Sequence, residues 1–136
     1  MTHFPDAPHG RRRQPHRILV VDDVPDVRQV HSTFLYGSGM EVSTAENGII
    51  ALDAARHALP DVVVTDLEMP VMDGLDLCRH LRADAATRDV VVVVVTGGAP
   101  DQAQAALDAG CDAVLGKPCS QTLLLATIRQ LLERRD

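Results

Sequence analysis

The sequence contains few aromatic residues, with no tryptophan, one tyrosine and two phenylalanines among 136 residues. Aliphatic side chains must therefore build the core, and the hydrophobic fraction of 46% is enough for one sizeable core in a single domain. No apolar run approaches the roughly 20 residues that span a bilayer. The N-terminus also lacks the apolar block of a secretory signal. We therefore expect a soluble, cytoplasmic protein without a membrane span.

Cysteine and lysine are also scarce. The three cysteines are odd in number and form no CxxC pair, which argues against a disulfide framework and a zinc site. Lys117 is the only lysine. Residues 1–17 carry four arginines and one aspartate, a charge of +3. Since the net charge of the chain is −6, residues 18–136 carry −9. This acidic body argues against nucleic acid as the main partner and predicts no direct DNA binding.

Residues 1–16 contain three prolines, a glycine and a cluster of three arginines, without apolar periodicity. This composition predicts a disordered basic tail. From residue 17 to residue 136, strand and helix signals alternate, which predicts one folded domain. The strand signals are at 18–21, 40–45, 62–66, 90–95 and 113–115, and the helix signals run from about 25, 49, 73, 100 and 120.

Strict alternation of five strands and five helices implies right-handed crossovers and a doubly wound α/β fold, with helices on both faces of a parallel sheet. The first, third and fourth strands are continuously apolar, as central strands are, whereas the second and fifth are more polar or shorter. This pattern fits the flavodoxin-like strand order 2-1-3-4-5.

Charged and polar residues stand where these strands end. The first strand stops at Asp22-Asp23 and the third at Asp66, and these two strands flank the switch point where such sheets bind ligands. The fourth and fifth strands end at Thr96 and Lys117, on the same rim. We therefore expect all five side chains to converge in space.

The predicted cluster has an unbalanced charge. Three carboxylates carry −3, and Lys117 brings the sum to −2. Like charges at close range oppose joint ionisation, so the cluster needs protons or a metal ion. Oxygen ligands without histidine or cysteine select a hard cation, so we expect Mg²⁺, with Mn²⁺ as a substitute. A phosphoryl group would contact the metal, Lys117 and the Thr96 hydroxyl, which makes Asp66 a nucleophile for phosphoryl transfer.

Each residue also has a simpler interpretation. An acidic pair after a strand often forms only a turn or caps a helix, and Asp66 could do the same. A threonine that ends a valine run is usually part of the strand, and a Lys-Pro pair is usually a solvated loop. The joint occurrence of these residues at four strand ends favours the functional interpretation.

The sequence resembles the receiver domain of two-component response regulators, particularly the stand-alone type of the chemotaxis regulators. The resemblance covers residues 17–136, in the expected order and spacing. It rests on Ile18-Leu19-Val20-Val21-Asp22-Asp23, Asp66-Leu67-Glu68-Met69-Pro70-Val71-Met72-Asp73-Gly74, Val95-Thr96 and Gly116-Lys117-Pro118.

The resemblance implies a role for each of these residues. Asp66 would accept a phosphoryl group from a histidine kinase or a histidine phosphotransfer protein. Asp22, Asp23, Asp66 and the backbone carbonyl of Glu68 would arrange Mg²⁺. Lys117, with a cis peptide bond to Pro118, would pair with phosphoryl oxygens, and Thr96 would swing its hydroxyl onto the phosphoryl group.

One position departs from the family. An aromatic residue that turns inward with the threonine usually stands three positions before the lysine, where this chain has Val114. The switch residues would then be Thr96 and Val114, assisted by a Gly97-Gly98 hinge. By the same resemblance, Glu68 and Gly98 occupy positions that modulate the lifetime of the phosphoryl group.

We therefore predict a single-domain signalling protein, not an enzyme, that catalyses only its own phosphorylation and dephosphorylation. A downstream protein would bind the surface of the fourth helix, fifth strand and fifth helix. A homodimer is a further possible assembly. Two alternatives remain: a pseudo-receiver that binds partners without phosphorylation, and an aspartate-nucleophile phosphohydrolase using Asp66 and Glu68. The second would need a substrate-enclosing cap, for which the chain leaves no residues.

Overall fold

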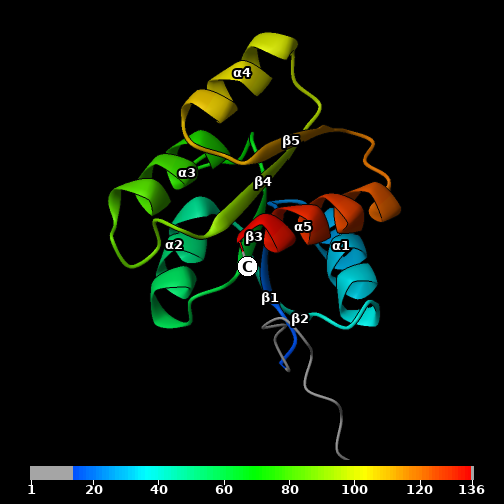
Figure 1. Ribbon diagram of the computed structural model, residues 1–136. Coiled ribbons are helices and arrows are strands. Elements are labelled where there is room, and N and C mark those ends of the chain that lie inside the picture. Colours follow the sequence, from blue (N-terminus) through cyan, green and yellow to red (C-terminus); the bar gives the residue numbers. More distant parts are fainter. Residues whose placement is uncertain (1–13, 136) are drawn as a thin grey trace, which may run out of the picture.

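The computed structural model describes residues 14–135, so residues 1–13 of the predicted tail lie outside the described residues. Strands and helices alternate along the chain (Figure 1). The strands are β1 (Arg17–Val21), β2 (Glu41–Ala45), β3 (Val62–Asp66), β4 (Val91–Thr96) and β5 (Ala113–Gly116). The helices are α1 (Pro25–Gly37), α2 (Gly48–His57), α3 (Gly74–Ala83), α4 (Pro100–Asp108) and α5 (Gln121–Arg135).

The five strands form one parallel sheet in the order β2-β1-β3-β4-β5, which confirms the predicted topology. Helices α1 and α5 cover one face, and α2, α3 and α4 lie on the other (Figure 1). Side chains of β3 alternate between the two halves of the core: Val63 packs on the α2–α3 side, and Val62 and Val64 on the α1–α5 side. Both faces of a central strand are buried, which is why its sequence is continuously apolar.

Local signals place the helix ends. The side chain of Asp73 accepts the Asp76 N–H at 2.8 Å, and the Ser120 hydroxyl accepts the Leu123 N–H at 3.2 Å, so these residues cap α3 and α5 where the helix signals predict their starts. Asn47 caps α2 in the same way, since its side chain accepts the Ile50 N–H at 2.9 Å.

The valine run is shifted by one residue from its predicted place in the sheet. The sequence predicts a strand over 90–95, whereas β4 spans Val91–Thr96. The Val90 N–H bonds to the Thr87 carbonyl in the preceding turn, and Thr96 pairs with Gly116 of β5. Within residues 14–135, no helix combines the length and apolar character needed to cross a membrane.

Candidate functional site

Three carboxylates meet at the carboxyl ends of β1 and β3. Because Val21 pairs with Thr65, the next residue of each strand emerges at the same rim. One carboxylate oxygen from each of Asp22, Asp23 and Asp66 lies within 4.8 Å of the others. Asp22 and Asp66 are buried, at 2% and 8% exposure, and Asp23 is exposed. The predicted convergence of these side chains is therefore present.

The two buried carboxylates divide their oxygens between two tasks. Asp22 Oδ1 accepts the Val24 N–H at 2.9 Å, and Asp66 Oδ1 accepts the Glu68 N–H at 3.4 Å. These are the turn contacts of the simpler interpretation. The Oδ2 atoms remain, and both face Lys117. The turn and the cluster are therefore formed by the same residues and do not exclude each other.

Lys117 follows β5 and supplies the positive charge of the cluster. Its Nζ lies 3.3 Å from Asp66 Oδ2 and 3.7 Å from Asp22 Oδ2. The backbone N–H of Lys117 donates to the Thr96 carbonyl at 3.0 Å, so β4 helps to position it. The Lys117-Pro118 peptide bond is cis, as the family resemblance implied.

Burial dominates the electrostatics of Asp66. It raises the pKa of this carboxyl above its ordinary value. The Lys117 ammonium lowers the pKa, and the Asp22 carboxylate raises it again. Their sum leaves the pKa of Asp66 raised, so a further cation near Asp66 would stabilise its ionised form.

The donor set fits a hard divalent cation. The three clustered groups offer only carboxylate oxygens, and three carboxylates with one lysine leave an excess of negative charge. Asp22, Asp23 and Asp66 are thus able to hold such an ion. The predicted contribution of the Glu68 carbonyl stays a prediction.

The two predicted switch residues belong to neighbouring strands: Thr96 is the last residue of β4, and Val114 lies within β5. Thr96 is 4% exposed, and its hydroxyl accepts the Gly98 N–H at 3.0 Å in the loop before α4. Val114 is half-buried and packs on the core between the sheet and α2, α3 and α4. Thr96 is thus joined to the β4–α4 loop by a hydrogen bond, and the switching roles of both residues stay predictions.

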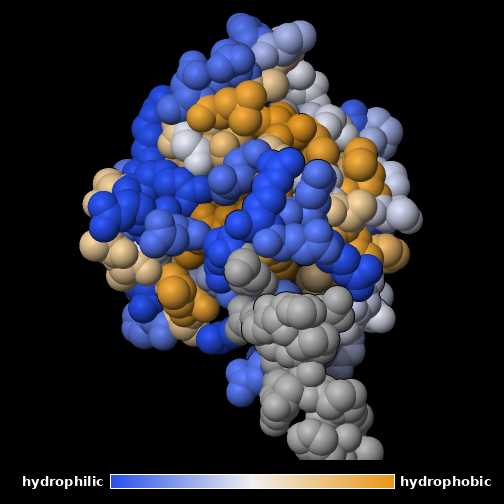
Figure 2. All heavy atoms as spheres, in the orientation of Figure 1, coloured by the Kyte–Doolittle hydropathy of each residue, from blue (hydrophilic) through white to orange (hydrophobic). Residues whose placement is uncertain are grey.

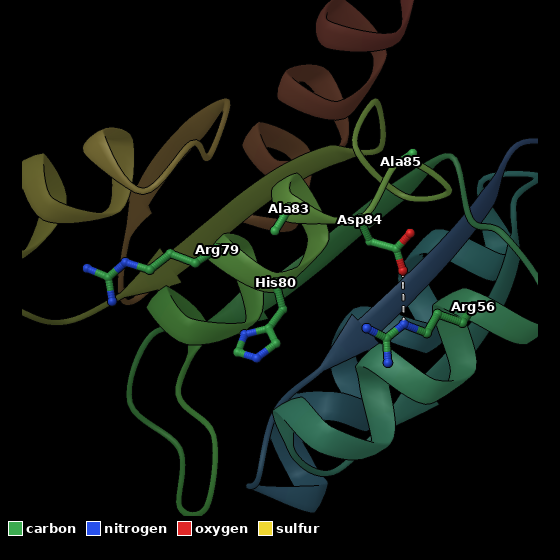
Figure 3. A pocket seen from close by; sticks show the side chains of 6 residues that line it. All are labelled: Arg56, Arg79, His80, Ala83, Asp84 and Ala85. Carbon is green, nitrogen blue, oxygen red and sulfur yellow. Dashed lines mark hydrogen bonds and ion pairs between the residues drawn. The ribbon is translucent and has the colours of Figure 1, made fainter.

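Three surface hollows differ in their position relative to the acidic cluster. A hollow of about 550 Å³ at the C-terminal ends of α2 and α3 has paired side chains: Arg56 Nε lies 3.1 Å from Asp84 Oδ2 (Figure 3). This is the end of the sheet opposite the acidic cluster. A hollow of about 280 Å³ between α1 and the β5–α5 loop includes Lys117, and one of about 470 Å³ between the β3–α3 loop and α4 includes Glu68. The last two flank the cluster.

Sequence reasoning missed two residues near the rim. Arg28 Nη1 donates to the backbone carbonyl of Asp22 at 2.7 Å and so supports the turn after β1. The side chain of Gln102, in the first turn of α4, lies against Gly98. No local pattern distinguishes either residue from other polar residues on a helix, because both contacts depend on how the helices pack.

A family profile described as the response regulator receiver domain matches residues 18–129. The response regulator MprA of Mycobacterium sp. (strain KMS) is 41% identical over 120 residues, which cover 88% of this chain and 52% of that protein. The response regulator PleD of Caulobacter vibrioides (strain NA1000 / CB15N) is 40% identical over 117 residues, 85% of this chain and 26% of that protein. The chain thus spans about half of the first relative's length and about a quarter of the second's, and the stand-alone expectation stays a prediction.

Solved structures have the same fold. The chemotaxis protein CheY4 of Vibrio cholerae is 32% identical with a TM-score of 0.81, covering 85% of this chain and 98% of that one. A CheY-like receiver domain protein of Methanospirillum hungatei JF-1 is 25% identical with a TM-score of 0.83, covering 89% and 96%.

Proposed function

Because the chain belongs to the response regulator receiver domain family, we propose that it is a signalling switch that becomes phosphorylated on Asp66. The observation that carries this proposal is the 3.3 Å contact of Asp66 Oδ2 with Lys117, inside a cluster that still holds excess negative charge. A buried carboxylate with a cation beside it and further acids around it suits a nucleophile more than a structural ion pair.

The proposed reaction transfers a phosphoryl group to a carboxylate oxygen of Asp66. A P–O bond forms, the bond from phosphorus to the donor breaks, and its electron pair leaves with the donor's imidazole nitrogen or with acetate. The Lys117 ammonium would pair with a phosphoryl oxygen, and the Thr96 hydroxyl would donate to another after rotation. These groups stabilise charge on the transferred group without taking part in bond making.

A divalent cation would act with these residues. We propose that Asp22, Asp23, Asp66 and the Glu68 carbonyl hold Mg²⁺, for which Mn²⁺ can substitute. When bound, the ion would neutralise the carboxylates and the phosphoryl oxygens. The chain's own contribution is to hold the carboxylates together before the ion arrives, through the turns at Val24 and Glu68.

The phosphoryl donor is proposed to be a histidine kinase or a histidine phosphotransfer protein in the cytoplasm. Apolar surface lies beside Lys117: Val30 of α1 is 53% exposed, and it lines the 280 Å³ hollow with Val27 and Pro118. A folded donor can bury this surface while presenting its phosphohistidine to Asp66.

The output is proposed to be a protein contact on the surface of α4, β5 and α5. Leu107 of α4 and Leu123 of α5 are 44% and 51% exposed. Figure 2 shows hydrophobic residues gathered below α4, over the region that β5 occupies in Figure 1. Movement of Thr96 would reach this surface through the β4–α4 loop and Val114.

The test is incubation with acetyl phosphate or phosphoramidate in Mg²⁺, followed by intact mass measurement. One phosphoryl adduct is expected on the wild type and none on Asp66→Asn. Asp53→Asn, the same change on the exposed face of α2, should be labelled like the wild type. A chelator should prevent labelling.

Two outcomes favour other functions. An unlabelled wild type, beside a labelled control receiver, would indicate a pseudo-receiver. Continuous turnover of a generic phosphate ester that depends on Asp66 would indicate a phosphohydrolase.

A further inference from the structure

The side chain of Gln102 occupies the space that a side chain at position 98 would take. A Cβ built on Gly98 would lie 1.5 Å from Gln102 Oε1 and 3.3 Å from Thr96 Oγ1. The carboxamide of Gln102 therefore lies against the Gly98 Cα, and Gln102 Oε1 and Thr96 Oγ1 both border the space that this Cβ would fill. Glycine at position 98 makes this approach possible.

The Oε1 atom of Gln102 is a buried acceptor without a hydrogen-bond partner among residues 14–135. Buried side-chain acceptors are nearly always paired, so an unpaired one calls for an explanation. Its neighbour, the Gly98 N–H, is a donor that is already used: it donates to Thr96 Oγ1 at 3.0 Å. The unpaired acceptor Gln102 Oε1 thus lies close to the Gly98 N–H, a donor that would lose its partner when Thr96 turns in the proposed reaction.

We propose that Gln102 is a positioning residue for Thr96, an inference that rests on the proposed function. When the Thr96 hydroxyl turns to the phosphoryl group, the Gly98 N–H loses its acceptor, and Gln102 Oε1 accepts that N–H. One hydrogen bond is exchanged for another, so the rotation of Thr96 leaves the Gly98 N–H with an acceptor and gives the buried Gln102 Oε1 a donor. The exchange ties the state of Asp66 to the first turn of α4.

This coupling supplies a route to the output surface that needs no aromatic ring. Val114 offers no polar group and little volume to signal with, whereas Gln102 belongs to the helix that carries Leu107. Gly97 has only the Lys117 Cβ within 4 Å of a Cβ built on it, at 3.8 Å, so the loop has room to move.

The experiment compares Gln102→Met, which keeps the length of the side chain but removes the acceptor, with Gln102→Glu, which retains an acceptor. Gln104→Met is the matched control, since Gln104 is exposed on the same helix and bonds only to Asp108 in the described structure. Each protein is activated with beryllofluoride and Mg²⁺, and hydrogen exchange of the Gly98 amide is followed by NMR. Acetyl phosphate labelling of Asp66 is measured in parallel.

Gln102→Met should be labelled like the wild type, yet its Gly98 amide should exchange roughly three- to tenfold faster in the activated state, the factor expected for one lost hydrogen bond. Gln102→Glu and Gln104→Met should stay protected. Gly98→Ala displaces the carboxamide without removing it, so the backbone amide at position 98 should also exchange faster in the activated state. It serves as a second variant if Gln102→Met does not fold.

A labelled Gln102→Met with wild-type protection of Gly98 would overturn this inference alone. Failure of the wild type to be labelled would instead overturn the proposed function, and the inference with it.

Discussion

Lys117 Nζ lies closer to Asp66 Oδ2, at 3.3 Å, than to Asp22 Oδ2, at 3.7 Å, although it contacts both. The only lysine of the chain therefore joins the ends of β1, β3 and β5. Its ammonium opposes the burial that raises the pKa of Asp66, while Asp22 adds to it. The protonation of Asp66 is thus set by three strands together.

Two substitutions are expected to move the pKa of Asp66 in opposite directions. Lys117→Met should raise it further, because the ammonium that lowers it is removed. Asp22→Asn should lower it, because a like charge is removed. NMR titration of the Asp66 carboxyl carbon in the presence of a chelator measures both shifts. Shifts of the same sign in the two variants would contradict the electrostatic account.

The raised pKa of Asp66 also predicts how stability depends on pH in metal-free protein. A raised pKa in the folded state contributes stability that is complete below the pKa of the unfolded chain and is lost as pH rises through the folded-state pKa. Asp66→Asn should therefore be more stable than the wild type at neutral pH, and this advantage should shrink in acid. Urea unfolding at the two pH values, in chelator, checks the sign. An advantage that grows in acid would be inconsistent with it.

Gly74→Ala is expected to destabilise the protein by roughly 1–3 kcal/mol. A Cβ on Gly74 would lie 2.4 Å from the Asp66 carbonyl oxygen and 3.0 Å from Leu67 Cα, and backbone cannot swing aside. Urea unfolding measures the loss. Gly37→Ala is the control, because a Cβ there meets nothing within 4 Å, so no destabilisation is expected. Equal stability of the two variants would contradict the packing argument.

Val71→Asn is expected to raise the free energy of unfolding by about 1 kcal/mol. Val71 has a φ of 74°, a left-handed conformation that costs a β-branched residue more than it costs asparagine. Its side chain is 78% exposed, so little packing is lost. Val30→Asn, on the exposed face of α1, should give no such gain. Thermal or urea unfolding of both variants makes the comparison.

Iodoacetamide at about pH 8 is expected to alkylate Cys119 first. Burial raises the pKa of all three thiols, that of Cys111 to about 12, but only Cys119 is half-exposed. Cys78 and Cys111 should react once urea unfolds the chain. Peptide mass mapping gives the order, and native labelling of Cys119→Ser at either buried site would refute it.

Much of the fold is predictable because its signals are local. Runs of valine mark strands that are buried on both faces, and prolines and polar caps mark helix starts at Pro25, Asp73 and Ser120. The one-residue shift of β4 arose because a valine run does not reveal which of its N–H groups a preceding turn will take. Pairing with β5 then draws Thr96 into the strand.

The acidic cluster was predictable for a different reason. Parallel strands end at one rim, so residues that follow them must be neighbours once the strand order is known. The choice between a turn and a cluster was not predictable, because it depends on how two oxygens of one carboxylate are shared. Asp22 and Asp66 each use Oδ1 for the turn and Oδ2 for Lys117.

Hydrophobic periodicity, breakers and caps thus suffice to specify the elements of this protein to within about a residue, their order in the sheet and the acidic residues that meet at its rim. Packing alone places Gln102 against Gly98, twists Val71 into a left-handed conformation and brings Lys117 nearer to Asp66 than to Asp22. The reason is physical: periodicity depends on neighbours in the chain, whereas these contacts depend on side chains and backbones that meet only when the layers close.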